Sequence, residues 1–180
     1  ILWDMQNESP SFGDLTGEVI RQLRSLDLQK RPWDNGWGEP VEDTDPLECH
    51  PYPFFDSNFR LSNLDQMSNR AWWVKDVSAY SNPQIINEYG WLWLTRNGDP
   101  TPLTQNLYDQ ILPNATAEER QTYYADALAT LTEFWRAGRY HAGVLQFCIL
   151  SYDISGRYTC DVLGPDLTTP EIPVYMAQKL

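Results

Sequence analysis

The sequence has no run of about 18 apolar residues, so it predicts no segment that spans a membrane. Its first residues also lack the basic and apolar pattern of a signal peptide. They read as Ile1-Leu2-Trp3, which is typical of the interior of a strand. We therefore expect no membrane partner, and we interpret the chain as a fragment of a larger domain.

Basic residues are scarce in this sequence. Lys and Arg together number 13, against 25 Asp and Glu, which gives a formal net charge of −12 at pH 7. Binding to nucleic acid depends on clustered Lys and Arg that neutralise phosphates. The composition therefore predicts that nucleic acid is not a partner, and it favours a neutral or cationic ligand.

Cysteine is also scarce, with three residues at Cys49, Cys148 and Cys160. They form no C-x-x-C pair and have no histidine at the intervals of a zinc site. The sequence therefore predicts no structural metal. One disulfide could form, and the odd count leaves at least one thiol free.

Aromatic residues, by contrast, are abundant, with eight Trp and ten Tyr. Flat apolar rings fill protein cores, and in binding sites they also stack on the faces of sugars. We expect at least half of six tryptophans to pack into the interior and the others to be candidates for stacking. The six are Trp33, Trp37, Trp72, Trp73, Trp91 and Trp93.

Five segments have the composition of strands, and helical patterns follow several of them. The strand candidates are residues 1–6, 31–35, 46–54, 84–88 and 142–150, the last expected to be buried on both faces. Strands that alternate with helices predict an α/β fold with a parallel sheet. No glycine-rich phosphate loop follows the first strand, which argues against a dinucleotide-binding sheet. Because five open units would leave two bare sheet edges, part of a closed barrel is favoured.

Two helices are expected, at residues 14–26 and 116–138, with a weaker helical pattern at 61–73. Thr116 and Glu119 form a capping box, which predicts where the second helix begins. Residues 95–113 read as loop or short helix, and the tail from residue 151 as mostly irregular. The side chains expected to face inward are Leu15, Val19, Ile20 and Leu23 in the first helix, and Tyr124, Leu128, Leu131 and Trp135 in the second.

Polar residues at the strand ends are the candidates for a functional site. Glu8 ends the first strand and Glu88 ends the fourth. The carboxyl ends of strands are where α/β barrels place their chemistry. An ionised carboxylate at the end of a buried strand is costly unless it is paired, so Glu88 suggests a function. His50 and Tyr52 share one strand face, although a lone histidine is more often structural than catalytic.

Four motifs occur in a familiar order: Asn7-Glu8, His50-Pro51-Tyr52, Asn87-Glu88-Tyr89-Gly90-Trp91 and the run 143–153. Together they resemble the clan A retaining glycoside hydrolases, most closely the TIM-barrel domain of the β-galactosidase and β-glucuronidase family. The resemblance implies that residues 1–180 are the C-terminal part of one (β/α)8 catalytic domain and supply strands 4 to 8 with their helices. Strands 1 to 3 would come from preceding residues or another chain.

The resemblance also implies residue roles. Glu8 would be the acid/base, Glu88 the nucleophile, and Asn7 the residue that holds the sugar 2-hydroxyl. His50 and Tyr52 would line the site. Phe147 stands where the family often has a tryptophan platform under the sugar, so the usual substrate contact is altered. Further candidates for substrate binding are Trp33, Asp34 and Trp91.

The implied activity is that of a retaining β-glycosidase, which cleaves a β-linked glycoside or polysaccharide by double displacement without a cofactor. Such an enzyme needs two carboxyl groups about 5 to 5.5 Å apart. Two alternatives remain open from the sequence. One is a non-catalytic carbohydrate-binding or structural protein built on the same barrel, and the other is an unrelated α/β domain in which both glutamates are incidental.

Overall fold

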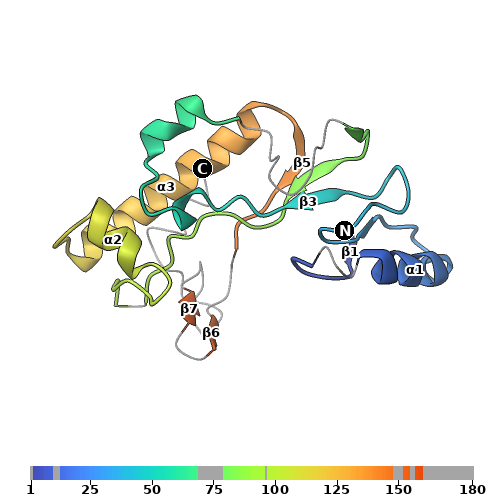
Figure 1. Cartoon of the computed structure of the whole chain (residues 1–180), viewed down its shortest axis with the longest axis horizontal. Coiled ribbons are helices and arrows are strands. Elements are labelled where there is room, and N and C mark those ends of the chain that lie inside the picture. The colour runs from blue at the N-terminus through green and yellow to red at the C-terminus, as the bar shows by residue number, and fades with distance from the viewer. Residues whose placement is uncertain are drawn as a thin grey trace.

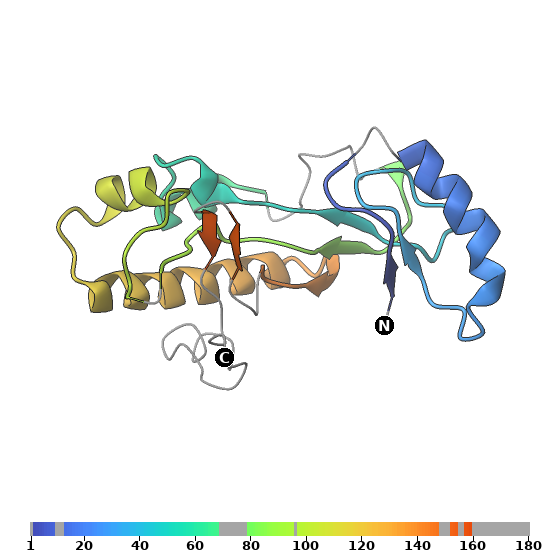
Figure 2. The same ribbon diagram turned by 90° about the horizontal axis from the view of Figure 1, so that it is seen from below.

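The computed structural model of the chain describes residues 2–9, 13–68, 79–95, 97–147, 152–154 and 157–159. The arrangement is elongated, with the N-terminal helix at one end and the two C-terminal helices at the other (Figure 1). The central strands run between these ends, and the longest helix lies along one side of them (Figure 2).

The first five strands of the described fold pair in parallel, as the sequence predicts. β1 (Trp3–Asp4) pairs with β2 (Trp33–Asp34), and β3 (Leu47–Cys49) pairs with β4 (Gln84–Ile86). β4 also pairs in parallel with β5 (His141–Val144), so the sheet order is β3-β4-β5. Among the described residues these strands form two small separate sheets and do not close a barrel. The architecture is therefore a partial α/β fold.

The C-terminal segments differ from expectation. Residues 142–150 were expected to be a strand buried on both faces, but β5 ends at Val144, and Ala142 and Leu145 are exposed. Among the described residues, β5 lies at the edge of its sheet and pairs with β4 alone, which leaves its other side without a neighbouring strand. The tail also contains a short antiparallel hairpin, β6 (Tyr152–Ile154) with β7 (Arg157–Thr159). Residues 148–151 and the rest of the tail lie outside the described residues.

The first helix covers the expected span, as α1 (Gly13–Leu23) and the 3-10 turn η2 (Arg24–Leu26). Its expected apolar face is only partly buried. Ile20 is fully buried, whereas Leu15 is 63% and Leu23 39% exposed. The two-residue strands β1 and β2 offer little sheet surface against which the helix can pack, so its apolar face is left half covered.

The last helix, α3 (Ala117–Ala137), confirms the sequence prediction most closely. The Thr116 hydroxyl accepts the Glu119 N–H at 3.2 Å, and the Glu119 carboxylate accepts the Thr116 N–H at 2.7 Å. The four side chains predicted to face inward are all buried. They pack with Ile86, Tyr89 and Leu92 in one hydrophobic core, which fixes the segment after β4 against the helix.

Shorter helices complete the described fold. α2 (Gln105–Ile111) lies in the segment expected to be loop or short helix. Two 3-10 turns, η3 (Pro53–Phe55) and η4 (Leu61–Gln66), follow β3. The helix expected at 61–73 is thus a 3-10 turn as far as Gln66, and residues 69–78 lie outside the described residues. In the part of the chain that is described, no helix has the length and apolar character needed to cross a bilayer.

Candidate active site

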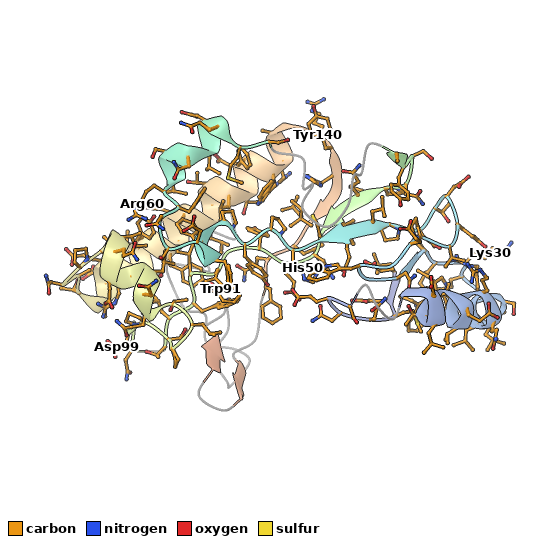
Figure 3. All side chains as sticks on the ribbon, in the orientation of Figure 1. Lys30, His50, Arg60, Trp91, Asp99 and Tyr140 are labelled. Atoms are coloured by element: carbon orange, nitrogen blue, oxygen red, sulfur yellow. The ribbon has the colours of Figure 1, made fainter. Side chains whose placement is uncertain are left out.

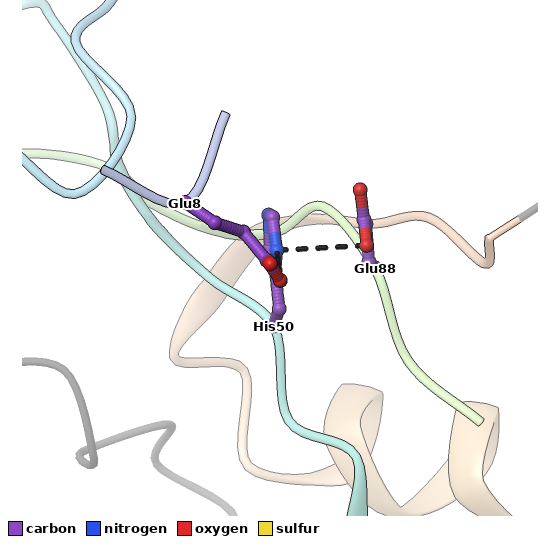
Figure 4. A group of neighbouring side chains, drawn as sticks. All are labelled: Glu8, His50 and Glu88. Carbon is purple, nitrogen blue, oxygen red and sulfur yellow. Dashed lines mark hydrogen bonds and ion pairs between the residues drawn. The ribbon is translucent and has the colours of Figure 1, made fainter. Parts of the chain in front are cut away.

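Glu8, His50 and Glu88 meet at the carboxyl ends of three different strands, β1, β3 and β4 (Figure 4). His50 Nδ1 lies 2.8 Å from Glu8 Oε1 and 3.5 Å from Glu88 Oε2. One carboxylate oxygen from each glutamate and one ring nitrogen of His50 all lie within 4.8 Å of one another. Two carboxylates 80 positions apart in the sequence, Glu8 and Glu88, therefore share one imidazole.

The Glu8 loop is held by a close approach to the loop after β2. Gln6 donates its amide N–H to the Asn35 carbonyl at 2.8 Å, and it packs against Gly36. A Cβ on Gly36 would stand 2.7 Å from Gln6 Cγ and from the Gln6 carbonyl oxygen, and the φ of +55° there also favours glycine. Glu8 itself has a positive φ of 38°, a strained conformation for a non-glycine residue. Such strain is often found where a side chain is held for a function.

Glu88 is more enclosed than Glu8. Its side chain is 16% exposed, against 41% for that of Glu8. Burial raises the pKa of Glu88, whereas the hydrogen bond that Tyr52 donates to Glu88 Oε2 and the charge of His50 act to lower it. The charge of Glu8 raises the pKa of Glu88 further. The two carboxylates thus differ in burial and in their hydrogen-bond partners.

His50 is completely buried and lies between carboxylates. Burial alone would lower the pKa of His50, but the nearby carboxylates of Glu48, Glu8 and Glu88 raise it to about 9. Glu48 Oε2 lies 3.5 Å from His50 Nε2 on the side away from Glu8. It also accepts the Asn87 amide N–H at 2.8 Å. The imidazole is therefore expected to be an imidazolium at neutral pH.

Asp34 on β2 belongs to the same acidic group. It is fully buried, and its Oδ1 accepts the Gly36 N–H at 3.0 Å. Burial, followed by the charges of Glu48 and Asp4, raises the pKa of Asp34 to about 8. Burial and the charge of Glu48 raise the pKa of Asp4 as well. At neutral pH, Asp34 is thus mostly protonated in the folded protein.

This protonation predicts a pH dependence of stability. Between about pH 4 and pH 8 the folded state holds a proton on Asp34 that the unfolded state has lost, so stability falls as pH rises through this window. Asp34→Asn is expected to flatten that fall while keeping the hydrogen bond to Gly36. The measurement is the urea midpoint of unfolding at several pH values from 4 to 8.

The matched control for Asp34→Asn is the exposed Asp65→Asn, which should follow wild type. His50, whose pKa is raised, contributes stability that is fully present below about pH 6.5 and is lost as pH rises through about 9. A residual decline above pH 6.5 is therefore expected in all three proteins. Parallel curves for wild type and Asp34→Asn would show that Asp34 is not the group that titrates.

Aromatic side chains line one side of the site. Trp91 lies between Tyr52 and Phe55, with ring centroids 5.2 and 4.9 Å away, and its centroid is 4.7 Å from that of Trp93. Trp93 is buried, and it donates its indole N–H to the Phe147 carbonyl at 3.1 Å. Figure 3 shows Trp91 and His50 along the central part of the chain. Trp91 remains partly exposed, so part of its ring is open to a ligand.

The structure brings most of the predicted site residues together. Glu8, His50, Tyr52 and Glu88 are joined by direct contacts, and Asp34 is coupled to them through His50 and Glu48. Trp91 contacts Tyr52, and Phe147 joins the group through Trp93. Asn7 precedes Glu8 with an exposed side chain.

Trp33 does not join this group. It is 6% exposed, and its ring packs against Trp3 at a centroid distance of 5.8 Å, so it has little surface for a sugar. Trp93 is likewise a core residue. Trp37, by contrast, lies edge-on to His50, with centroids 5.8 Å apart. Trp72 and Trp73 lie outside the described residues.

Sequence reasoning missed Glu48 and the amide of Asn87 as members of the site. A signal for Glu48 was present, because residues two apart on a strand share a face, and Glu48 precedes His50 by two positions. That alternation placed His50 with Tyr52 in the prediction, and it places Glu48 with them equally. The contact with Asn87 depends on pairing between β3 and β4 and has no local signal.

Two carboxylates and an imidazole are also groups that can coordinate a divalent cation. Among the described residues, Glu8, His50 and Glu88 form such a group. The 2.8 Å between His50 Nδ1 and Glu8 Oε1 is, however, a direct hydrogen-bond distance. Glu88 Oε2 already accepts the Tyr52 hydroxyl. We therefore assign the three residues to a hydrogen-bonded site.

Comparison with known proteins gives a likeness in structure only. No protein-family profile matches the sequence, and no curated protein matches it. The β-D-glucuronidase of Dictyoglomus thermophilum superposes with a TM-score of 0.63 at 14% identity, over 99% of this chain and 31% of that one. β-Glucuronidases of Faecalibacterium prausnitzii (TM-score 0.61, 14% identity) and of an uncultured Clostridium species (0.63, 15%) give the same coverage.

This chain therefore spans less than a third of the length of these enzymes, and it shares the fold of that part. The likeness supports the resemblance inferred from the motifs as far as the fold is concerned. At this level of identity it says nothing of activity or substrate.

Proposed function

We propose that this chain carries the two catalytic carboxylates of a retaining β-glycosidase, with Glu88 as nucleophile and Glu8 as acid/base. The observation that carries the proposal is the approach of their carboxylate oxygens to within 4.8 Å. Retaining enzymes hold the two groups about 5 to 5.5 Å apart, whereas inverting enzymes leave about 6.5 to 9.5 Å for a water molecule. The proposed scaffold is a TIM barrel, to which this chain contributes strands 4 to 8.

In the first step, the Glu88 carboxylate attacks the anomeric carbon and the bond to the leaving oxygen breaks. Glu8 donates its proton to that oxygen, so the aglycone leaves as a neutral alcohol. Tyr52 donates a hydrogen bond to Glu88 in the free protein, which orients the attacking carboxylate. As Glu88 forms the ester its charge is consumed, so the carboxylate that Glu8 becomes on losing its proton is not repelled by a second one.

In the second step, Glu8 acts as a base. It removes a proton from water, the water oxygen attacks the anomeric carbon, and the ester bond to Glu88 breaks. Glu8 is again protonated and Glu88 is again ionised. Two inversions at the anomeric carbon give net retention. Asn7, adjacent to Glu8, is proposed to hold the sugar 2-hydroxyl, and Trp91 to stack on a sugar ring.

The charges around the site favour an uncharged sugar. Five acidic residues interact with His50 or lie near it, namely Asp4, Glu8, Asp34, Glu48 and Glu88, of which Asp34 is mostly protonated at neutral pH. The described arginines that form ion pairs contact acids outside this group, as in Arg31–Asp27 and Arg120–Asp99. A uronic acid would bring a further negative charge to this group. We therefore propose a neutral β-hexoside as the substrate.

The test uses the natural full-length polypeptide and a panel of 4-nitrophenyl β-glycosides that includes galactoside, glucoside and glucuronide. Hydrolysis of a neutral member is expected, with the β-anomer of the sugar appearing first in ¹H NMR spectra, before mutarotation. The α-anomer as first product would overturn the retaining mechanism, and preference for the glucuronide would overturn the choice of sugar. Binding of sugars without hydrolysis would identify a non-catalytic carbohydrate-binding protein instead.

A further inference from the structure

Glu48 occupies a place that the proposed reaction does not yet use. It is the middle residue of β3, and its side chain is 1% exposed. A buried carboxylate is costly, and it is retained only where it is paired or hydrogen-bonded. Glu48 Oε1 has no hydrogen-bond partner within the described ranges, so its contacts are all made through Oε2.

The contacts of Oε2 reach residues of two of the three chain segments that carry the site. On its own strand, Glu48 Oε2 lies 3.5 Å from His50 Nε2, at ion-pair distance. Just after the neighbouring strand β4, it accepts the Asn87 side-chain amide N–H at 2.8 Å, one residue before Glu88. Asn87 is held from its backbone as well, because its N–H donates to the Cys49 carbonyl at 3.2 Å. One buried oxygen thus contacts the imidazole beside both carboxylates and the residue next to the nucleophile.

From this geometry we propose that Glu48 is a positioning residue for the proposed reaction, which holds His50 with Nε2–H toward the interior and Nδ1 toward Glu8. The proposal rests on the proposed function and adds a role for a residue behind the two catalytic carboxylates. Glu48 does not touch the reacting atoms. It acts through His50 and through the Asn87 side chain.

The consequence for the acid/base is a shared proton. The Glu48 carboxylate lies 3.5 Å from Nε2, so its charge favours a proton on that nitrogen, and only Nδ1 exchanges a proton with its neighbour. The 2.8 Å hydrogen bond to Glu8 then carries one proton, which lies on Nδ1 or on Glu8 Oε1. Glu8 gives this proton to the leaving oxygen in the first step and recovers one from water in the second. The number of protons on the pair is therefore restored after each turnover.

Acids from several described segments lie around His50. Asp4 comes from β1, Glu8 from the loop after it, Asp34 from β2, Glu48 from β3 itself and Glu88 from the segment after β4. Of these, Glu8 and Glu88 face Nδ1, and Glu48 faces Nε2. Glu48 is therefore the described acid that can fix which ring nitrogen keeps its proton.

The first test needs no variant of the site. The chain has two histidines, so ¹⁵N-histidine labelling gives a simple spectrum, and His141→Gln assigns the signals. As pH rises through the titration of His50, the neutral imidazole is expected to be the Nε2–H tautomer. A neutral form protonated on Nδ1 would overturn the proposal, whether or not the protein hydrolyses glycosides.

The second test is Glu48→Gln, which keeps the size of the side chain and removes its charge. The pH at which His50 titrates is expected to fall by at least one pH unit, a tenfold change in proton concentration, toward the ordinary range of histidine. In a protein that hydrolyses the neutral glycoside, kcat should fall by about 10²-fold with KM little changed, because the substrate contacts remain. The control is Glu133→Gln on the exposed side of α3, which should match wild type.

The outcomes separate the two proposals. A wild-type protein that hydrolyses no glycoside overturns the proposed function. An active wild type whose kcat and His50 titration are both unchanged by Glu48→Gln overturns the role of Glu48 alone. If Glu48→Gln does not fold, the tautomer measured in the wild-type protein still decides the case.

Discussion

Glu88→Gln is expected to lower kcat on a neutral aryl β-glycoside by about 10⁴-fold or more, as is typical when an enzyme loses its covalent nucleophile. A neutral amide cannot form the glycosyl ester. KM should change little, because the amide has nearly the shape of the carboxylate and its oxygen can still accept the Tyr52 hydroxyl. The measurement is steady-state hydrolysis with the natural full-length polypeptide.

The loss should be chemical rather than structural. Burial raises the pKa of Glu88, so replacing its charge by an amide removes a group that is costly to ionise in the folded state. The thermal midpoint of Glu88→Gln is therefore expected to equal or exceed that of wild type. Glu133→Gln, on the exposed side of α3, controls for the change of a glutamate to glutamine. Hydrolysis retained by Glu88→Gln within tenfold of wild type would remove Glu88 from the role of nucleophile.

Glu8→Gln is expected to give a loss that depends on the leaving group. With a methyl glycoside, whose alkoxide needs a proton, kcat/KM should fall by about 10² to 10⁴-fold. With a dinitrophenyl glycoside, the first step needs little acid and should be nearly unchanged, so the glycosyl-enzyme accumulates. The measurement is a pre-steady-state burst of dinitrophenolate followed by slow turnover.

Azide should restore turnover of the dinitrophenyl glycoside by Glu8→Gln, because it attacks the anomeric carbon without needing a base. The expected product is the β-glycosyl azide, with Glu88 released. Glu18→Gln, an exposed change on α1, is the matched control and should show neither the burst nor the rescue. An equal loss for both leaving groups, without rescue, would contradict the acid/base role of Glu8.

Much of the local structure could be predicted because its signals are local. The capping box at Thr116 and the 3.6-residue period of Tyr124, Leu128, Leu131 and Trp135 fix where α3 begins and which face it buries. The same period on α1 predicted a buried face that is only half formed. Periodicity states which side of a helix is apolar, whereas burial depends on how much sheet is there to cover it.

The sequence predicted which residues belong to the candidate site better than it predicted the contacts between them. Strand-end position pointed to Glu8 and Glu88, and strand alternation joined His50 to Tyr52. Trp33 was also a candidate for substrate binding because it lies on a predicted strand, yet its ring is buried against Trp3. Glu48 carried a usable signal but was missed, since an acid on a short strand reads equally well as an exposed residue. Whether Trp33 and Glu48 lie inside or outside the site depends on which face of their strand packs against other segments.

By itself, the sequence determined the apolar faces of the helices and the ends of the strands. It also determined that a glutamate, a histidine and a second glutamate follow three of those strand ends, in that order. Only the tertiary structure decided that Glu8, His50 and Glu88 meet within 4.8 Å, and that Glu48 holds His50 from behind. The physical reason is that helix and strand periods act between neighbouring residues. The meeting of residues 8, 50 and 88 depends instead on the parallel pairing of β3 with β4 and on the position of the loop after β1. That loop can pack closely against Gly36 because glycine has no Cβ.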